Sequence, residues 1–296
     1  MTYVLGHNQY GKAEVRVVRV FRDQDPHELV DYNVSVALTG DFAAAHTSGD
    51  NTLVLTTDAM KNTVFGFAKE REEAVRTPEG FGLALAEHFV QDVPQVATAR
   101  VKVEQYPWRR AHGHPHAFVR SGEHIRTATV THRPEGVTVV SGLRELTVLK
   151  TTDSEFHGFY TERFTTLAPT TDRIMATSVT AQWCHADPAA GTDWDDSFTR
   201  VKDALTSTYA AAHSLALQHT LWDMGRAALD AAPEVVEVRL SCPNKHHFVV
   251  DLAPFGLEND HEVHHADDRP YGLIEATIAR DASVDVSHAY DPGQAW

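Results

Sequence analysis

The sequence contains little cysteine and no long apolar run, and each absence excludes a class of protein. Only Cys184 and Cys242 occur among its 296 residues, so we expect neither a disulfide framework nor a Cys-x-x-Cys pair. No apolar stretch approaches the length needed to span a bilayer. The sequence also lacks a glycine-rich nucleotide-binding fingerprint, a Walker loop and a Gly-x-Ser-x-Gly elbow, which argues against the enzyme classes that depend on them.

Basic residues are also scarce relative to acidic ones. The chain has 26 Lys and Arg residues against 41 Asp and Glu residues, which gives a formal net charge of −15 at pH 7. Nucleic-acid binding needs a basic face, so this balance argues against a nucleic-acid partner. A small anionic ligand remains compatible with it, because one buried arginine outweighs the net charge locally.

Neither end of the sequence carries a recognisable targeting signal. The first residues lack the basic and apolar regions of a signal peptide, and the last residues lack the peroxisomal Ser-Lys-Leu ending. We therefore expect a cytoplasmic protein with no membrane partner.

The sequence does contain one short motif twice, and we call this repeat the doubled phrase. The segment Val54-Leu55-Thr56-Thr57-Asp58 precedes Phe65-Gly66-Phe67. The segment Val148-Leu149-Lys150-Thr151-Thr152-Asp153 precedes His157-Gly158-Phe159. Such a recurrence, about a hundred residues apart, predicts a duplicated structural unit in which each copy is a short apolar strand followed by a turn.

The apolar pattern predicts the order strand–strand–helix–helix–strand–strand in each half of the chain. In the first half, strands are expected over residues 13–20 and 29–38, and a helix runs from Asp58 to about Val75. A second helix begins at Thr77-Pro78-Glu79. In the second half, strands are expected over residues 172–180, 235–240, 247–252 and 273–279, and helices over residues 197–212 and 214–231.

This order predicts an α+β protein with two domains, residues 1–142 and 143–296. Each domain would be an antiparallel sheet with two helices layered on one face. Sheets of this kind leave edges that pair with further copies, so we expect a barrel-like oligomer closed through sheet edges.

Several residues are candidates for chemistry, each with a plain structural alternative. Thr57 and Asp58 lie where a strand is expected to meet a helix, a position that helix capping also explains. Lys12 follows Tyr10-Gly11 near the start of the chain, where a solvated surface lysine is common.

Histidines form two candidate metal clusters. His112, His114 and His116 alternate, so on a strand they would share one face, as zinc or iron ligands do. His261, His264 and His265 form the second cluster. Such spacings near Gly and Pro are also typical of ordinary loops. Cys184-His185 is too isolated to indicate a nucleophile pair.

The second half holds the candidates for ligand recognition. Arg173 lies in a strand-like stretch, either at an edge or as a planar fork aimed into a pocket. Gln218 follows Leu217 on an apolar helix and could offer a donor and an acceptor if it faces inward. Phe156 is explained equally well as a core residue. Residues 243–248 are densely polar after a strand, which a turn with incidental histidines also explains.

Taken together, these segments resemble the urate oxidase (uricase) family, in particular its bacterial members, over nearly the whole chain. Six motifs in order at compatible spacing carry the resemblance. They are Tyr10-Gly11-Lys12, Thr57-Asp58 with Lys61-Asn62-Thr63, His114 to Phe118, Leu146 to Lys150 with Phe156 to Phe159, Asp172-Arg173-Ile174, and Pro243 to His246.

The resemblance implies the tunnelling fold (T-fold), with two tandem domains per subunit and a homotetramer around a central channel. It implies oxidation of urate by O₂ to 5-hydroxyisourate and hydrogen peroxide, with no metal and no organic cofactor. Because the segment His112 to His116 matches a family that needs no metal, the metal hypothesis weakens.

The resemblance also implies roles for particular residues at a site between subunits. Catalysis is assigned to Lys12, Thr57 and His246 as a proton relay. Substrate binding is assigned to Thr57, Asp58, Phe156, Arg173, Leu217, Gln218 and Asn244. Arg173 and Gln218 would pair with opposite edges of the purine, and Phe156 would stack on its face.

Two rival functions remain open at this point. One is a pterin-processing T-fold enzyme that uses zinc or a cysteine. The other is a purine-binding protein without catalysis, against which the presence of Lys12, Thr57 and His246 argues, because binding alone needs no relay.

Overall fold

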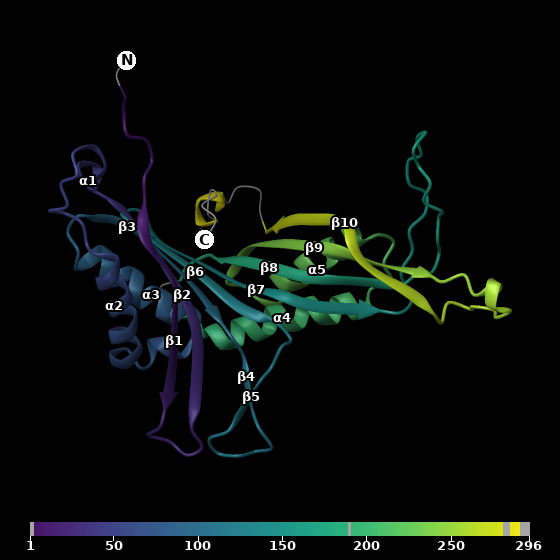
Figure 1. The fold of residues 1–296 in the computed structure, drawn as a ribbon, viewed down its shortest axis with the longest axis horizontal. Helices are drawn as coiled ribbons and strands as arrows, with labels where there is room; N and C mark the ends of the chain where they lie inside the picture. The colour runs from purple at the N-terminus through teal and green to yellow at the C-terminus, as the bar shows by residue number, and fades with distance from the viewer. Residues whose placement is uncertain (1–2, 189–190, 281–284, 291–296) are drawn as a thin grey trace. The chain divides into compact units, whose positions relative to one another are not determined.

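The computed structural model describes residues 3–188, 191–280 and 285–290 (Figure 1). By its internal contacts the chain divides into two compact units. Unit 1 comprises Met1–Gly142, Cys184–Asp196 and Ser283–Trp296. Unit 2 comprises Leu143–Trp183 and Ser197–Ala282. The division into two tandem domains, residues 1–142 and 143–296, stays a prediction.

Unit 1 is built on antiparallel strands. They are β1 (Tyr10–Phe21), β2 (Glu28–Gly40), β3 (Val96–Gln105), β6 (Ile125–Arg133) and the first half of β7 (Gly136–Lys150). β1 pairs with β2, β2 with β3, and β3 with β6. Side chains on β1 alternate, with Val15 and Val17 buried and Arg16 and Val18 exposed, as the sequence pattern predicts. A small hairpin, β4 (Trp108–Arg110) and β5 (Phe118–Arg120), stands apart from this sheet.

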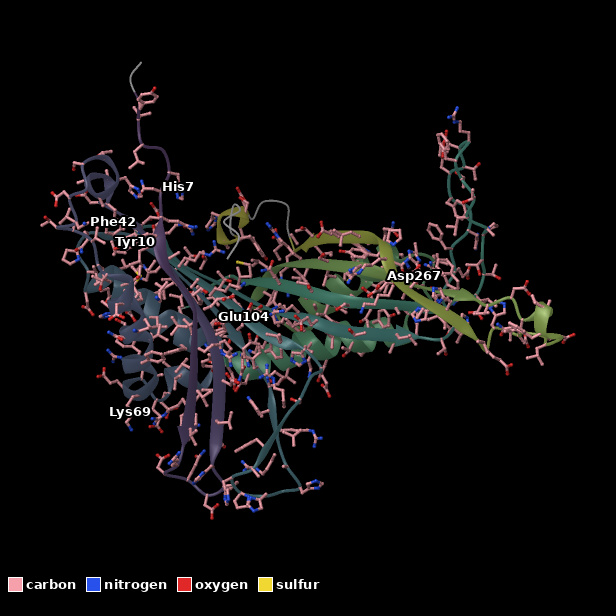
Figure 2. The ribbon with its side chains drawn as sticks, viewed as in Figure 1. His7, Tyr10, Phe42, Lys69, Glu104 and Asp267 are labelled. Carbon is pink, nitrogen blue, oxygen red and sulfur yellow. The ribbon has the colours of Figure 1, made fainter. Side chains whose placement is uncertain are left out.

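Helices α2 (Thr57–Glu70) and α3 (Pro78–Gln91) pack on the strands of unit 1 (Figure 1). Helix α3 begins as predicted, because Thr77 accepts a hydrogen bond from the Gly80 amide at 3.1 Å and Pro78 occupies the first turn. Its apolar face is fully buried in the core. At the start of β1, the ring of Tyr10 meets that of Phe42 edge-on at 4.7 Å (Figure 2). Helix α1 (Ala43–Thr47) and the 3₁₀ turns η1 (Ala74–Arg76) and η3 (Ser287–Ala289) complete the unit.

Unit 2 repeats this plan. Its strands are the second half of β7, β8 (Met175–His185), β9 (Val235–Val249) and β10 (His264–Ala279). Helices α4 (Trp194–Ala211) and α5 (Leu217–Ala231) supply one side of its core, and η2 (Ala253–Phe255) lies between β9 and β10. Helix α5 approaches β10 closely at Gly225, where a Cβ would lie 2.6 Å from the side chain of Ile278.

The predicted order of strands and helices is therefore confirmed in both units, apart from small extra elements. The architecture is that of the T-fold, an antiparallel sheet with helices on one side. Among the described residues, no helix is long and apolar enough to cross a membrane.

Several predicted boundaries are wrong. The helix expected from Asp58 to about Val75 ends at Glu70, and η1 follows as a separate turn. The strand expected over residues 172–180 begins only at Met175, because the Thr170 hydroxyl donates to the Asp172 carbonyl and accepts from the Asp172 amide, a local turn that competes with a strand. The helix expected from Ser214 begins at Leu217. The two strands expected over residues 235–240 and 247–252 are one strand, β9, so residues 243–248 are not a turn.

The doubled phrase does not mark equivalent positions. Its first copy leads into α2 after β2, and Val54-Leu55 is not a strand. Its second copy ends β7 and leads to a long loop before β8, with no helix following. The units are duplicated in their element order, but the phrase that suggested duplication falls at different points of that order.

Candidate functional site

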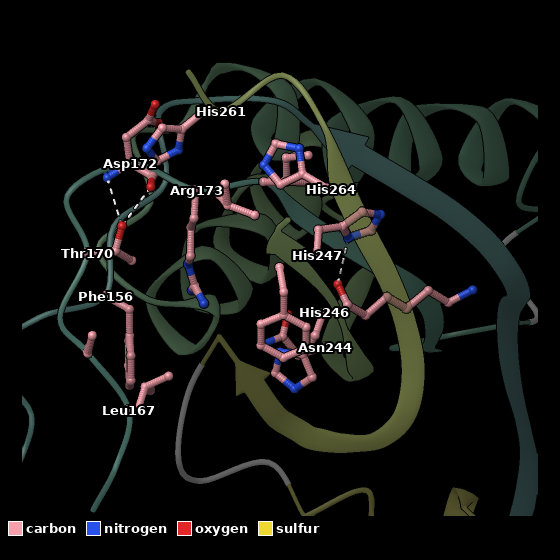
Figure 3. Close-up of a pocket in the computed structure, with 15 residues that line it drawn as sticks. Phe156, Leu167, Thr170, Asp172, Arg173, Asn244, His246, His247, His261 and His264 are labelled. Carbon is pink, nitrogen blue, oxygen red and sulfur yellow. Dashed lines mark hydrogen bonds between the residues drawn. The ribbon is translucent and has the colours of Figure 1, made fainter. Parts of the chain in front are cut away.

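Unit 2 contains a pocket of about 320 Å³ between a loop and strand β9 (Figure 3). The loop, residues 151–174, contributes Phe156, Thr170 and Arg173. β9 contributes Asn244 and His246. Four predicted site residues, Phe156, Arg173, Asn244 and His246, therefore line one pocket.

The backbone fixes Phe156 at the wall of this pocket. Its amide donates to the Thr170 carbonyl at 2.8 Å, and the Thr170 amide donates back at 2.9 Å. Phe159 stacks on the Phe156 ring with 5.0 Å between centroids and 17° between planes. The ring is half-buried, so Phe156 is a pocket wall and not a core residue.

Arg173 lies in the pocket beside this ring. The guanidinium carbon is 5.3 Å from the centroid of Phe156. The Nε atom of Arg173 is buried and has no hydrogen-bond partner among the described residues. Burial lowers the pKa of the Arg173 guanidinium, an effect that the nearby Tyr209 partly offsets. A half-buried cation whose buried Nε is left open as a donor is suited to a planar ligand that carries oxygen or nitrogen acceptors.

Strand β9 presents Asn244 and His246 where its pairing with β10 is interrupted. The register shifts between Asp267, opposite His246, and Gly272, opposite Asn244. Residues 268–271 of β10 therefore form a bulge opposite Lys245, directly after Asp267, which Figure 2 labels. The His246 ring stacks on Phe248 with 5.6 Å between centroids. Alternation along the strand places Asn244 and His246 on the same face.

Lys12 belongs to unit 1 and lies at a β-bulge. The β1–β2 register shifts between Lys12 and Val15, so two residues of β1 face Ser35 alone. Glu14 has a φ of +57° there, and its amide donates to the Ser35 hydroxyl at 3.0 Å. Gly11 allows the close approach just before, because a Cβ would lie 1.8 Å from a backbone oxygen of β2. The bulge thus changes the direction in which the side chain of the half-buried Lys12 leaves the strand.

Thr57 and Asp58 open helix α2 in the same unit. Thr56, not Thr57, accepts the capping hydrogen bond, from the Ala59 amide at 3.1 Å, so capping does not explain Thr57. Asp58 accepts from Lys61 at 2.5 Å and from Asn62 at 2.9 Å. The Lys61 hydrogen bond, with a smaller contribution from the charge of Lys12, lowers the pKa of Asp58.

Leu217 and Gln218 are not among the residues that line the pocket. Both lie in the first turn of α5, where Leu217 is buried in the core and Gln218 is exposed. The preceding residue, Ala216, provides no side-chain cap. Within the described part of the chain no side chain caps α5, so its first backbone amides are open to an acceptor from elsewhere.

Two histidines that line the pocket belong to a cluster whose spacing in the sequence indicated only metal binding. His261 and His264 line it, whereas His112, His114 and His116 lie in the β4–β5 loop and not on a strand. Leu167 and Thr170 also line the pocket, and no pattern in the sequence indicated them. Within the described ranges, no group of three His, Cys, Asp or Glu residues is placed to hold a metal ion.

Neither cysteine is placed as a nucleophile. Both are buried, and burial raises the pKa of the Cys242 thiol to about 12. A thiol with so high a pKa carries almost no thiolate at neutral pH. The cysteine variant of the pterin-processing alternative therefore finds no support at Cys242.

Comparison with known proteins identifies the family. The uricase family model matches residues 8–131 and 139–275. The uricase of Arthrobacter globiformis is 49% identical over 280 residues, covering 95% of this chain and 91% of the relative. The Dictyostelium discoideum uricase is 37% identical over 284 residues, covering 93% and 97%.

Solved structures agree. The crystal structure of Arthrobacter globiformis uricase superposes with a TM-score of 0.92 at 48% identity, covering 96% of this chain and 98% of that one. The uricase structure from Bacillus fastidious, at 24% identity and a TM-score of 0.80, covers 93% and 94% and supports the fold. The chain therefore belongs to the uricase family, the enzymes that oxidise urate.

Proposed function

We propose that the chain oxidises urate with O₂ in the unit 2 pocket, with Lys12 and Thr57 of unit 1 and His246 of the pocket transferring protons. The observation that carries this proposal is the buried Nε of Arg173, which lacks a partner beside the Phe156 ring. A buried unpaired donor is unfavourable by about 1–3 kcal/mol, a penalty that a ligand acceptor in the pocket would remove.

The binding residues match the shape and polarity of urate, a flat purine anion with carbonyl and N–H groups around its rim. Arg173 presents a planar fork to one edge, and Phe156 stacks on the ring, worth about 1–3 kcal/mol by analogy with bases on aromatic side chains. Gln218 pairs with the opposite edge, and the open Leu217 amide donates to a rim acceptor. Asn244 holds O₂, and later water, over the reacting face.

The proton-transfer residues are Lys12, Thr57 and His246. Urate, O₂ and water give 5-hydroxyisourate and hydrogen peroxide, so urate supplies two electrons and O₂ accepts them. Protons must leave the purine and reach the reduced oxygen. The Thr57 hydroxyl is a poor base alone, so Lys12, in its neutral amine form, accepts the Thr57 proton and His246 completes the relay. Asp58 contacts the substrate beside Thr57.

We further propose that the active enzyme is a cytoplasmic homotetramer with each site formed between subunits. Lys12, Thr57 and Asp58 would come from one subunit and the pocket residues mainly from another. Large exposed apolar side chains in unit 2 support burial against a further copy, among them Tyr160, Phe164 and Phe255.

One assay tests the function directly. Purified chain is mixed with urate in air, and the loss of urate ultraviolet absorbance and the appearance of peroxide are measured with and without a chelator. We expect equal rates of urate loss and peroxide formation in both samples. No turnover, or turnover that the chelator abolishes, would contradict the proposed mechanism. Light scattering of the same sample tests the tetramer.

A further inference from the structure

The segment that carries Phe156 is tied to the turn before α5 by its backbone. The Ser214 amide donates to the Asp153 carbonyl at 2.9 Å, and the Glu155 amide donates to the Ser214 carbonyl at 2.7 Å. Ser154 and Ser214 are both completely buried at this bridge. Glu155, which precedes Phe156 in the chain, is thus hydrogen-bonded to the turn that leads to Leu217.

A side-chain cluster reinforces this bridge. The carboxylate of Glu155 accepts from the Nε2 atoms of two histidines, His213 on one oxygen and His157 at 2.6 Å on the other. His213 lies in the turn between α4 and α5, and its Nδ1 is 3.8 Å from an Asp153 oxygen. Glu155 keeps only 18% of its side chain exposed.

The same turn is fixed to the first turn of α5. The Thr220 hydroxyl donates to the Ser214 hydroxyl at 2.7 Å, and the Thr220 amide donates to the Ala216 carbonyl at 3.1 Å. A displacement of His213 would therefore move the start of α5, where Gln218 lies, relative to Phe156. These two residues are the proposed face and edge contacts of one rigid ligand.

We propose that Glu155 and His213 are positioning residues that set the spacing between Phe156 and the start of α5, and thereby the affinity for urate. This inference rests on the proposed function of the pocket. A rigid planar substrate makes the spacing decisive, because the ring contact and the rim contact must be met together.

The pKa shifts of the two residues both favour the ionised form of the pair. The hydrogen bond to Glu155 raises the pKa of His213, and the hydrogen bonds from His213 and His157 lower the pKa of Glu155. Asp153 also faces His213, and Lys150 interacts with Asp153. The ion pair is complete between the two pKa values. It weakens as the pH rises through the raised pKa of His213 or falls through the lowered pKa of Glu155.

The test compares Glu155→Gln, His213→Gln and the double variant with wild type. A matched control is Glu135→Gln, which removes an exposed carboxylate in the β6–β7 turn. The dissociation constant for urate is measured without oxygen, and KM and kcat are measured in air from neutral to alkaline pH. Thermal melts establish that each variant is folded.

We expect each single variant to raise the dissociation constant and KM by about fivefold to twentyfold, while kcat at saturating urate changes less than about threefold. The double variant should resemble the single ones, because the two residues act as one pair. The wild-type KM should rise with pH as His213 loses its proton, and Glu155→Gln should lack this rise.

Wild-type affinity and pH profile in both single variants would overturn the inference, as would a lowered melting temperature with unchanged KM, which indicates a merely structural pair. If one variant fails to fold, the other decides. A wild-type chain that neither binds nor oxidises urate would overturn the proposed function and this inference with it.

Discussion

The first strands of the two units share a backbone feature and differ in what it presents. β1 carries Glu14 at a φ of +57°, and β7 carries Glu145 at +65°. Each is followed by a buried aliphatic residue, Val15 or Leu146. Two positions before Glu14, unit 1 has the half-buried Lys12. Two positions before Glu145, unit 2 has Leu143, which is 1% exposed and belongs to the core.

The second helices differ in a similar way. Helix α3 is capped by Thr77, whose hydroxyl accepts from the Gly80 amide. Helix α5 follows Ala216, which offers no such acceptor, and leaves its first amides open beside Gln218. The two units thus share one order of elements, whereas a half-buried lysine lies on the first strand of unit 1 and an uncapped helix start lies in unit 2.

The largest expected effect concerns Lys12, on the first strand of unit 1. Lys12→Met should lower kcat by at least about a hundredfold, because the relay loses its proton acceptor. The melting temperature should change little, because Lys12 is outside the hydrophobic core. Steady-state urate oxidation and a thermal melt check both statements. An unchanged rate and pH profile would remove Lys12 from the relay.

The pocket of unit 2 predicts the next effect. Arg173→Lys keeps the charge but loses the planar fork, so kcat/KM should fall by about ten- to a hundredfold. Urate binding without oxygen should weaken by a similar factor. Full affinity in this variant would show that Arg173 does not face the substrate.

Leu143, which holds in unit 2 the position that Lys12 holds in unit 1, should contribute to stability and not to catalysis. Leu143→Ala removes a buried core side chain and should lower the free energy of unfolding by about 2–4 kcal/mol. KM at a temperature where the variant is folded should stay near that of wild type. Denaturant unfolding measures the first quantity, and a stable variant with impaired catalysis would reverse the assignment of roles.

The smallest effect concerns the open helix start. Ala216 has the extended backbone of an N-cap residue, so Ala216→Ser should cap α5 and add about 0.5–1 kcal/mol of stability. The new hydroxyl would accept from the His219 amide, as Thr77 accepts from that of Gly80, and would leave the Leu217 amide open, so KM should stay near that of wild type. Thr77→Ala in α3 is the matched control, with lower stability and unchanged KM.

Local patterns predicted the order of elements because alternation and helical spacing depend on near neighbours. They failed where side chains rearrange the backbone, as at Thr170 and Asp172, and therefore placed Arg173 inside a strand. The sequence pattern raised Arg173 and Phe156 only as candidates with structural alternatives, and the resemblance to the family assigned them to one site. The Glu155–His213 pair spans 58 positions and involves common residue types, so no sequence pattern indicated it.

The central claim is that Lys12 and Thr57 from one subunit serve the pocket of another, and a complementation assay tests it most directly. Lys12→Met and Arg173→Met chains, each inactive alone, are co-expressed and purified together. Random assembly should restore about a quarter of the wild-type sites, because each site draws its two halves from different chains. Lys12→Met with Thr57→Val should restore none, because both changes affect the same half. Mixed oligomers of the first pair that remain inactive would contradict the shared site.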